Sequence, residues 1–196
     1  MNISIKPNRL GGIWHLGWTL DRHTISSRRH DNGTFTTKRT ELGEALYRLK
    51  YCGDRKPLLP IARTVAAFIR DDVELSDQLS AIVPIPPSDT SRRFQPVLAI
   101  ANETGKILGL DSPSDYLVKV KKTSPLKDIE DRHSRSTQLA GAFTVRDLRF
   151  EGRCILLLDD LYRSGETLAW ATKVILAKGR VSRVFVLALT KTRIKR

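Results

Sequence analysis

The stretch from Cys154 to Leu168 reads Cys-Ile-Leu-Leu-Leu-Asp-Asp-Leu-Tyr-Arg-Ser-Gly-Glu-Thr-Leu. Its unbroken apolar start is typical of a parallel strand buried on both faces, and the apolar residues from Leu168 onward have the spacing of an amphipathic helix. The pattern predicts strand, loop and helix, with Asp159 and Asp160 at the carboxyl end of the strand. The free amides of the loop and the helix dipole suit a phosphate. Because carboxylates accept hydrogen bonds from sugar hydroxyls or hold Mg²⁺ through water, we expect a phosphorylated sugar as ligand.

The same stretch has two other interpretations besides a sugar-phosphate site. An apolar strand that ends in Asp-Asp is also the form of a Walker B strand, but no G-x-x-x-x-G-K-[ST] stretch precedes it. Acidic residues after a strand can also simply cap the next helix. The rest of the chain decides between these interpretations and the sugar-phosphate site.

Ile155–Thr167 resembles the phosphoribosyl pyrophosphate (PRPP) motif of type I phosphoribosyltransferases. In that motif an apolar strand is followed by Asp-Asp, two variable residues, Thr-Thr-Gly-x-Thr and a helix. The resemblance implies that Asp159 and Asp160 contact the ribose 2′- and 3′-hydroxyls. It also implies a 5′-phosphate loop, which here consists of Arg163, Ser164, Gly165, Glu166 and Thr167. Arg163 replaces the first Thr, which removes a hydroxyl and adds a cation, while backbone amides do most of the holding.

Composition sets the limits of the interpretation. The 196 residues suit one domain with a sizeable core, and the 40% hydrophobic and 28% charged content is ordinary for a globular protein. The formal net charge of +13 predicts a surface that attracts polyanions, either nucleic acid or a pyrophosphorylated substrate. A solvated basic surface without a dedicated partner is the alternative.

Cysteine and histidine usage indicates neither a disulfide framework nor a structural metal. The two cysteines, Cys52 and Cys154, are too few for either, and the four histidines lack ligand spacing. The first residues lack the apolar core of a signal peptide, and no run approaches membrane-spanning length. We therefore expect a cytoplasmic protein without a membrane partner.

The N-terminal residues 1–39 predict a small β meander. Aromatic and β-branched residues alternate with glycines over 13–27, and Asn32-Gly33 is a hairpin turn signal. Trp14 and Trp18 indicate local packing or a base-stacking platform. Arg28 and Arg29 beside the turn can touch nucleic acid or be simply solvated.

A helical period follows from Thr40, the expected N-cap, and ends near Tyr51. A second helix follows Pro57. Leu42–Arg55 resembles the Leu, Lys-Tyr, Gly-Asp-Arg element of the ComF family, competence-associated proteins built on the type I phosphoribosyltransferase fold. The zinc ribbon that is common at the N-terminus of ComF proteins is replaced here by the meander.

An apolar strand, 81–85, runs into prolines, and a helix begins near Pro96 and ends at a C-cap, Gly109. In the resembled family the loop after this strand binds pyrophosphate. Ser88, Arg92 and Arg93 suit that ligand because Arg bridges phosphate oxygens in a bidentate way. The alternative is a surface turn with two solvated cations.

The strand 116–120 leads into a highly charged stretch that ends at Arg135. In type I enzymes a loop at this place closes over the reacting centre, which implies that Lys121, Lys122, Thr123 and Arg135 cover the site and that Lys121 and Arg135 act in catalysis. A strand over 142–145, a helix that ends at Gly179 as its C′ residue, a last strand over 184–189 and a basic tail, 191–196, complete the chain.

This order predicts an α/β fold with a parallel sheet of the type I phosphoribosyltransferase kind over 40–190, with its active face at the carboxyl ends of the strands. The resemblance implies an enzyme that binds PRPP with Mg²⁺, the metal being held through substrate and water near Asp159 and Asp160, and that transfers phosphoribosyl to a nucleobase-type acceptor with release of pyrophosphate. The alternative is a non-catalytic ComF-like sensor of PRPP or nucleotides, or a nucleic-acid-binding module in DNA uptake or processing. A homodimer is a further expectation.

Overall fold

The structure is a computed structural model that describes residues 2–71, 75, 78–120 and 141–192. Its centre is a five-stranded sheet in the order β1-β2-β9-β8-β5. The strands are β1 (Asn8–Arg9), β2 (Leu16–Arg22), β5 (Leu79–Pro84), β8 (Cys154–Tyr162) and β9 (Arg183–Lys191). All neighbours pair in parallel except β1, which is antiparallel to β2. The predicted α/β fold with a mostly parallel sheet is confirmed.

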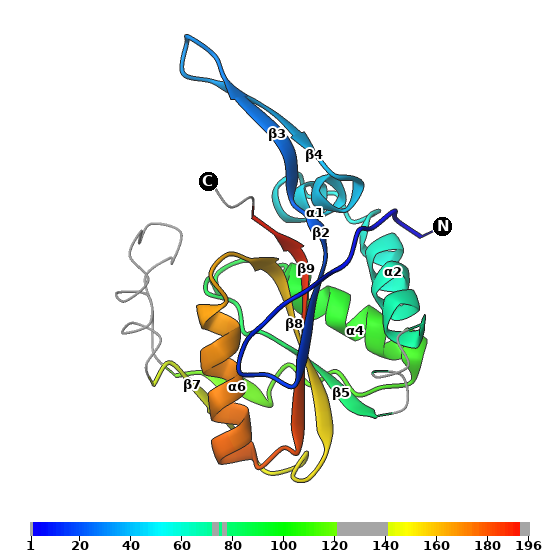
Figure 1. Cartoon of the computed structure of the whole chain (residues 1–196), viewed down its shortest axis with the longest axis vertical. Helices are drawn as coiled ribbons and strands as arrows, with labels where there is room; N and C mark the ends of the chain where they lie inside the picture. The colour runs from blue at the N-terminus through cyan, green and yellow to red at the C-terminus, as the bar shows by residue number, and fades with distance from the viewer. Residues whose placement is uncertain (1, 72–74, 76–77, 121–140, 193–196) are drawn as a thin grey trace.

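Helices cover both faces of this sheet (Figure 1). One face packs against α1 (Glu41–Tyr51), α2 (Leu58–Asp71) and α4 (Pro96–Leu108), and the other packs against α6 (Glu166–Gly179). Alternate residues of the central strands therefore pack into different hydrophobic cores. In β8, Leu156 and Leu158 pack on the face covered by α1, α2 and α4, and Ile155 and Leu157 pack on the face covered by α6. An apolar run without alternation is what a strand buried on both faces requires.

The N-terminal segment differs from the expected meander in one respect. β2 joins the central sheet beside β9, with Leu16 opposite Phe185 and Thr19 opposite Ala188. Trp18 and Trp14 are buried, with 3% and 7% of their surface exposed, so they are core residues and not a base-stacking platform. The apolar residues of β2 gain more burial beside β9 than a detached hairpin could offer.

The strands β3 (Thr24–Arg29) and β4 (Phe35–Arg39) form an antiparallel hairpin that extends away from the body of the molecule (Figure 1). We call residues 22–39, with this hairpin at their centre, the ribbon. Gly33 has a φ of 79° in the turn, as the Asn-Gly signal predicted. Most side chains of the two strands are exposed, including Phe35 and Ile25.

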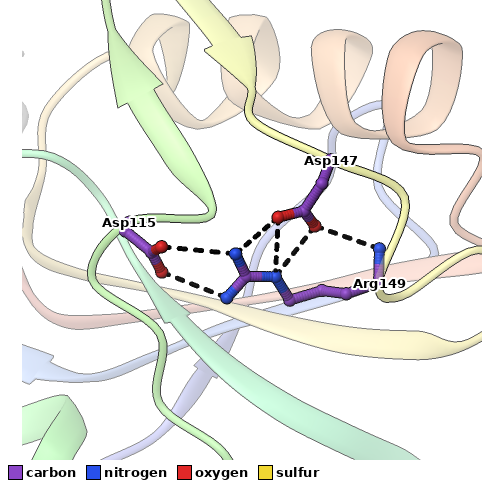
Figure 2. Close-up of polar contacts among 3 residues, drawn as sticks. All are labelled: Asp115, Asp147 and Arg149. Carbon is purple, nitrogen blue, oxygen red and sulfur yellow. Dashed lines mark hydrogen bonds and ion pairs between the residues drawn. The ribbon is translucent and has the colours of Figure 1, made fainter.

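A second two-stranded sheet consists of β6 (Leu117–Lys119) and β7 (Phe143–Val145), which pair antiparallel. Beside the start of β6 and the end of β7, which lie next to each other, Asp115, Asp147 and Arg149 form a cluster of ion pairs (Figure 2). The Arg149 guanidinium donates to Asp115 at 3.1 and 3.2 Å and to Asp147 on its other side. The two carboxylates raise the pKa of Arg149, and hydrogen bonds from Arg149 lower the pKa of each carboxyl group.

Candidate functional site

Both members of the Asp pair lie inside β8, which continues four residues beyond the apolar run to Tyr162. The strand is longer than expected because β9 runs beside it to Lys191, and Thr192 still donates its amide to the Tyr162 carbonyl. The loop between strand and helix is therefore short, 163–165. Gly165 ends it with a φ of 80°, a left-handed conformation that favours glycine.

Gly165 is also the N-cap of α6, and no side chain caps that helix. The first amides of a helix have no partner within it, and the helix dipole places partial positive charge at the same end. A cavity of about 120 Å³ lies there, lined by Asp159 and residues 161–168. We call it the loop cavity. Its position and its amides suit a phosphate group.

A second cavity of about 260 Å³ adjoins the first, since Asp159 and Thr167 line both. We call it the central cavity. Its other lining residues come from α1, β8, the loop after β5 and the start of α4: Lys50, Ile85, Pro86, Pro87, Ser88, Asp89, Arg92, Gln95, Pro96, Val97, Leu98 and Asp160. The carboxyl ends of β5 and β8 thus meet at one edge of the sheet, as a parallel arrangement requires.

Hydrogen bonds among its own polar groups hold the loop after β5 in place. The Asp89 carboxylate accepts hydrogen bonds from the amide and hydroxyl of Ser91, at 3.0 and 2.6 Å, and from Nε of Arg92 at 3.2 Å. The Gln95 side chain donates to the Asp89 carbonyl at 2.8 Å. These bonds lower the pKa of Asp89, and they hold Arg92 at the wall of the central cavity.

The central cavity also contains a cation, Lys50, that was not expected from the sequence. The Lys50 ammonium, from the last turn of α1, donates to Oδ2 of Asp160 at 2.6 Å. Burial works against the charge of Lys50, but the Asp160 carboxylate raises its pKa overall. The signal for it was present, because Lys50 belongs to the Lys-Tyr element that resembles ComF proteins.

The two carboxylates of the pair lie in different environments. Asp159 Oδ1 accepts the backbone amide of Asp160 at 2.8 Å. Burial, followed by the charge of Asp160, raises the pKa of Asp159 to about 7. Near neutral pH this carboxyl group is therefore partly protonated, while its neighbour Asp160 has an ammonium partner.

Two further groups complete the polar surroundings. Lys119 Nζ lies 3.4 Å from Oγ of Ser88, and burial lowers the pKa of this lysine. His23 Nδ1 lies 3.3 Å from Oγ1 of Thr190, which donates to the Asp160 carbonyl at 3.0 Å. Burial, and then the charges of Arg39 and Lys50, lower the pKa of His23, so it is a neutral neighbour at pH 7.

The structure brings most of the selected residues together. Ser88, Arg92, Asp159, Asp160 and Thr167 line the central cavity, and Arg163, Ser164, Gly165 and Glu166 line the loop cavity. Arg93 is exposed and lines neither of these two cavities.

Lys121, Lys122, Thr123 and Arg135 lie outside the described residues. Among the described residues, no group of three or more His, Cys, Asp or Glu side chains could hold a metal ion. The helices in the same part of the chain include none that is long and apolar enough to cross a membrane.

No protein-family model and no curated protein sequence matches the chain. Solved structures with a similar arrangement include adenine phosphoribosyltransferase from Trypanosoma brucei, with a TM-score of 0.49 and 10% identity over 98% of this chain and 87% of that one. Orotate phosphoribosyltransferase from Francisella tularensis gives a TM-score of 0.43 with 14% identity over 85% and 78%.

UMP synthase from Leishmania donovani gives a TM-score of 0.43 and 14% identity over 85% of this chain, which spans 28% of that protein. This chain also covers 62% of the length of a hypoxanthine phosphoribosyltransferase from Staphylococcus aureus. These are distant likenesses of fold, so the function proposed below depends on the geometry of the site.

Proposed function

We propose that the chain is a phosphoribosyltransferase-like protein that binds PRPP, or a related phosphorylated ribose, across the two adjoining cavities. One observation carries the proposal: an uncapped helix N-terminus and a cation-bearing cavity meet at the Asp159–Asp160 pair. A ligand with a phosphate at one end, hydroxyls in the middle and a pyrophosphate at the other end matches this order of groups. Because Leu42–Arg55 resembles an element of ComF proteins, we propose in addition that the chain belongs to the ComF-like branch.

Each part of the site has one role in this proposal. The amides at the start of α6 hold the 5′-phosphate, and Asp159 and Asp160 accept hydrogen bonds from the ribose hydroxyls. Ser88 and Arg92 bind pyrophosphate. Bond breaking at the anomeric carbon builds positive charge on the ribose, beside the two carboxylates, and negative charge on pyrophosphate, beside the cations of the central cavity. Lys121 and Arg135 would add cations to the leaving-group side.

The carboxylates of Asp159 and Asp160 suit an Mg²⁺ ion that is bound mainly through the substrate. Mg²⁺ commonly keeps several waters and binds through one or two carboxylates together with substrate phosphates. The Asp pair beside the central cavity supplies such carboxylates, and the cations Lys50 and Arg92 line the same cavity, where they can contact the phosphate oxygens of a ligand. When bound, the ion would neutralise charge on the leaving pyrophosphate.

The test is a calorimetric titration of PRPP with Mg²⁺ into the wild type and an Asp159→Asn/Asp160→Asn variant, followed by a pyrophosphate-release assay with a panel of nucleobases. We expect binding that the double substitution removes, and release by the wild type. Glu103→Gln, which removes a surface carboxylate on α4, is the control and should change neither result. Absence of PRPP binding by the wild type would refute the proposal, and binding without release would favour a sensor.

A second candidate function is nucleic-acid binding, and the ribbon favours it. Residues 22–39 contain five Arg and Lys residues and a single acidic residue, Asp31. Arg28, Arg29 and Lys38 are exposed on strands that project from the body (Figure 1). A two-stranded ribbon with this charge suits the phosphate backbone of a nucleic acid.

Fluorescence anisotropy with a labelled single-stranded oligonucleotide tests this second function. If Arg28 and Arg29 contact phosphates, Arg28→Gln/Arg29→Gln should weaken binding and lower the slope of log K against log salt by about 1.4. Arg63→Gln/Arg70→Gln on α2 removes the same charge from another surface and should leave the slope unchanged. Equal losses in both variants would mean that net charge, and not the ribbon, attracts the oligonucleotide.

We also propose a homodimer, which light scattering of the purified chain would test. A monomeric mass at micromolar concentration would contradict it.

A further inference from the structure

The ion pair between Lys50 and Asp160 joins two positions that are 110 residues apart in the chain. Both side chains are largely buried, with 19% and 18% of their surface exposed. The pair lies between the central cavity and a small cavity of about 50 Å³, since both residues line both. An ammonium at this place is inside the site and not on its rim.

In each carboxylate of the Asp159–Asp160 pair, one oxygen accepts a hydrogen bond from the protein and the other accepts none from the described residues. Asp159 Oδ1 accepts the Asp160 amide, and Asp160 Oδ2 accepts Lys50. Among the described residues, no hydrogen bond reaches Asp159 Oδ2 or Asp160 Oδ1. Two acceptors on consecutive residues therefore remain beside the central cavity.

Lys50 is held from both sides of the pair. Gly43 in α1 approaches the carbonyl oxygen of His23 so closely that a Cβ added there would overlap it, which fixes the helix against the base of the ribbon. On the other side, the Asp160 carbonyl accepts the Thr190 hydroxyl at 3.0 Å. The backbone that carries each member of the ion pair is thus held against a neighbouring element.

We infer that Lys50 is a positioning residue that makes this site selective for a sugar phosphate with two neighbouring hydroxyls. Lys50 fixes Asp160 as an oriented, charged acceptor, so that the remaining oxygens of the two carboxylates accept from one hydroxyl each. Without the ammonium, Asp160 would lose the partner that fixes its orientation, and the two carboxylates would repel each other. The inference rests on the proposed function, since it concerns the sugar part of the same ligand.

The experiment compares ribose 5-phosphate with 2-deoxyribose 5-phosphate by calorimetry in the wild type, Lys50→Met and Lys50→Arg, with inorganic phosphate as a third ligand. Loss of one hydrogen bond to a charged acceptor costs about tenfold in affinity, so the wild type should prefer the ribose ligand by about that factor. Lys50→Met should lose the preference and still bind inorganic phosphate as the wild type does. Lys50→Arg should retain most of it.

The control is Arg48→Met. Arg48 lies on the same helix as Lys50 but outside both cavities, and it forms an ion pair with Asp54, which follows the helix. This variant should keep the wild-type preference, because a purely structural role of α1 ion pairs would affect both variants alike. If Lys50→Met does not fold, Lys50→Gln removes the charge with a polar side chain and gives the same comparison.

The outcomes separate the two proposals. A preference that survives in Lys50→Met overturns this inference and leaves the proposed function standing. Loss of inorganic phosphate binding together with sugar binding also overturns it, since Lys50 would then support the whole site. Absence of binding of either sugar phosphate to the wild type overturns the proposed function, and the inference with it.

Discussion

Asp159 and Asp160 are neighbours in the chain with unequal surroundings. Asp160 has the Lys50 ammonium at 2.6 Å, whereas Asp159 has a backbone amide and the charge of Asp160 beside it. Burial and that charge raise the pKa of Asp159 to about 7. As the pH rises through neutrality, Asp159 therefore changes from a hydrogen-bond donor to an acceptor.

This pKa predicts that affinity for ribose 5-phosphate increases as the pH rises through 7. Below that pH Asp159 carries a proton that must leave before the carboxylate can accept a hydroxyl, so binding should release protons. Calorimetry at pH 6 in two buffers with different enthalpies of ionisation measures that release. The ligand's own phosphate, whose second pKa is about 6, also contributes protons at this pH, so Asp159→Asn should reduce the release and not abolish it. Release equal to that of the wild type would assign the titration to another group.

The same raised pKa has a consequence for stability. A carboxyl group whose pKa is higher in the folded protein than in the unfolded chain makes folding less favourable as the pH rises through the interval between the two values, here from about 4 to 7. Asp159→Asn should therefore raise the melting temperature at pH 8 relative to the wild type, and the difference should shrink towards pH 4. A constant difference at all pH values would contradict the raised pKa.

Local sequence predicted those site residues that lie at strand ends and missed the one that depends on a distant contact. Parallel strands end at one edge, so Ser88 and the Asp pair could be expected to meet. Lys50 belongs to the Lys-Tyr element that resembles ComF proteins, but its contact with Asp160 could not be read from local sequence, since the two are 110 positions apart. Arg93 was expected to bind pyrophosphate together with Arg92 because arginine bridges phosphate oxygens, but it lies outside the central and loop cavities.

At the scale of elements, helix ends followed their local signals. The Thr40 side chain caps α1 by accepting the Gly43 amide at 3.0 Å, and Gly109 ends α4 with a φ of 69°. The expectation for Gly179 was wrong, because α6 includes it and Arg180 takes the left-handed conformation, with a φ of 50°. Glycine is needed at 179 for packing, since a Cβ there would overlap the Tyr116 hydroxyl. No local pattern reveals that contact.

The close approach of α1 to the ribbon predicts the effect of a single methyl group. Gly43→Ala places Cβ against the backbone carbonyl of His23, so the helix that carries Lys50 must move. We expect a loss of about 1–3 kcal/mol of stability, seen as a lower melting temperature, together with weaker ribose 5-phosphate binding. Gly11→Ala, where a Cβ meets nothing within 4 Å, is the matched control and should behave as the wild type.

The Asp115–Arg149–Asp147 cluster should stabilise the β6–β7 pair through charge (Figure 2). Arg149→Gln should lower the melting temperature at pH 7, and less so in high salt. Because Arg149 holds the pKa of both carboxyl groups below the usual value, this contribution is present above about pH 4 and is lost as the pH falls through the lowered values. The difference in melting temperature between variant and wild type should therefore narrow as the pH falls below about 4.

Arg180→Gln, which breaks a single exposed ion pair with Glu151, is the control for this cluster and should have a smaller effect. A gap for Arg149→Gln that stays constant from pH 7 to pH 3 would mean that the side chain acts through packing.

At the scale of the molecule, the ribbon and the body should be separable. The ribbon is tied to the body at its base, where Arg39 pairs with Glu44 and lies 3.7 Å from the Tyr47 ring centroid. Thr24 and Arg39 are opposite each other, so an Asn-Gly turn can join them in place of residues 25–38. We expect this variant to melt within a few degrees of the wild type and to bind ribose 5-phosphate unchanged. Loss of cooperative unfolding would show that the body needs the ribbon.

The place of β9 has a consequence for how the protein is made. β9 lies between β2 and β8, so a strand formed by residues 183–191 separates strands that the ribosome produces much earlier. Until these residues emerge, β2 and one edge of β8 lack their partner, and apolar surface stays uncovered during synthesis. Pairing between positions this distant also slows folding, because a long loop must close first. We expect nascent chains that stop before residue 183 to remain bound to chaperones, whereas full-length chains are released.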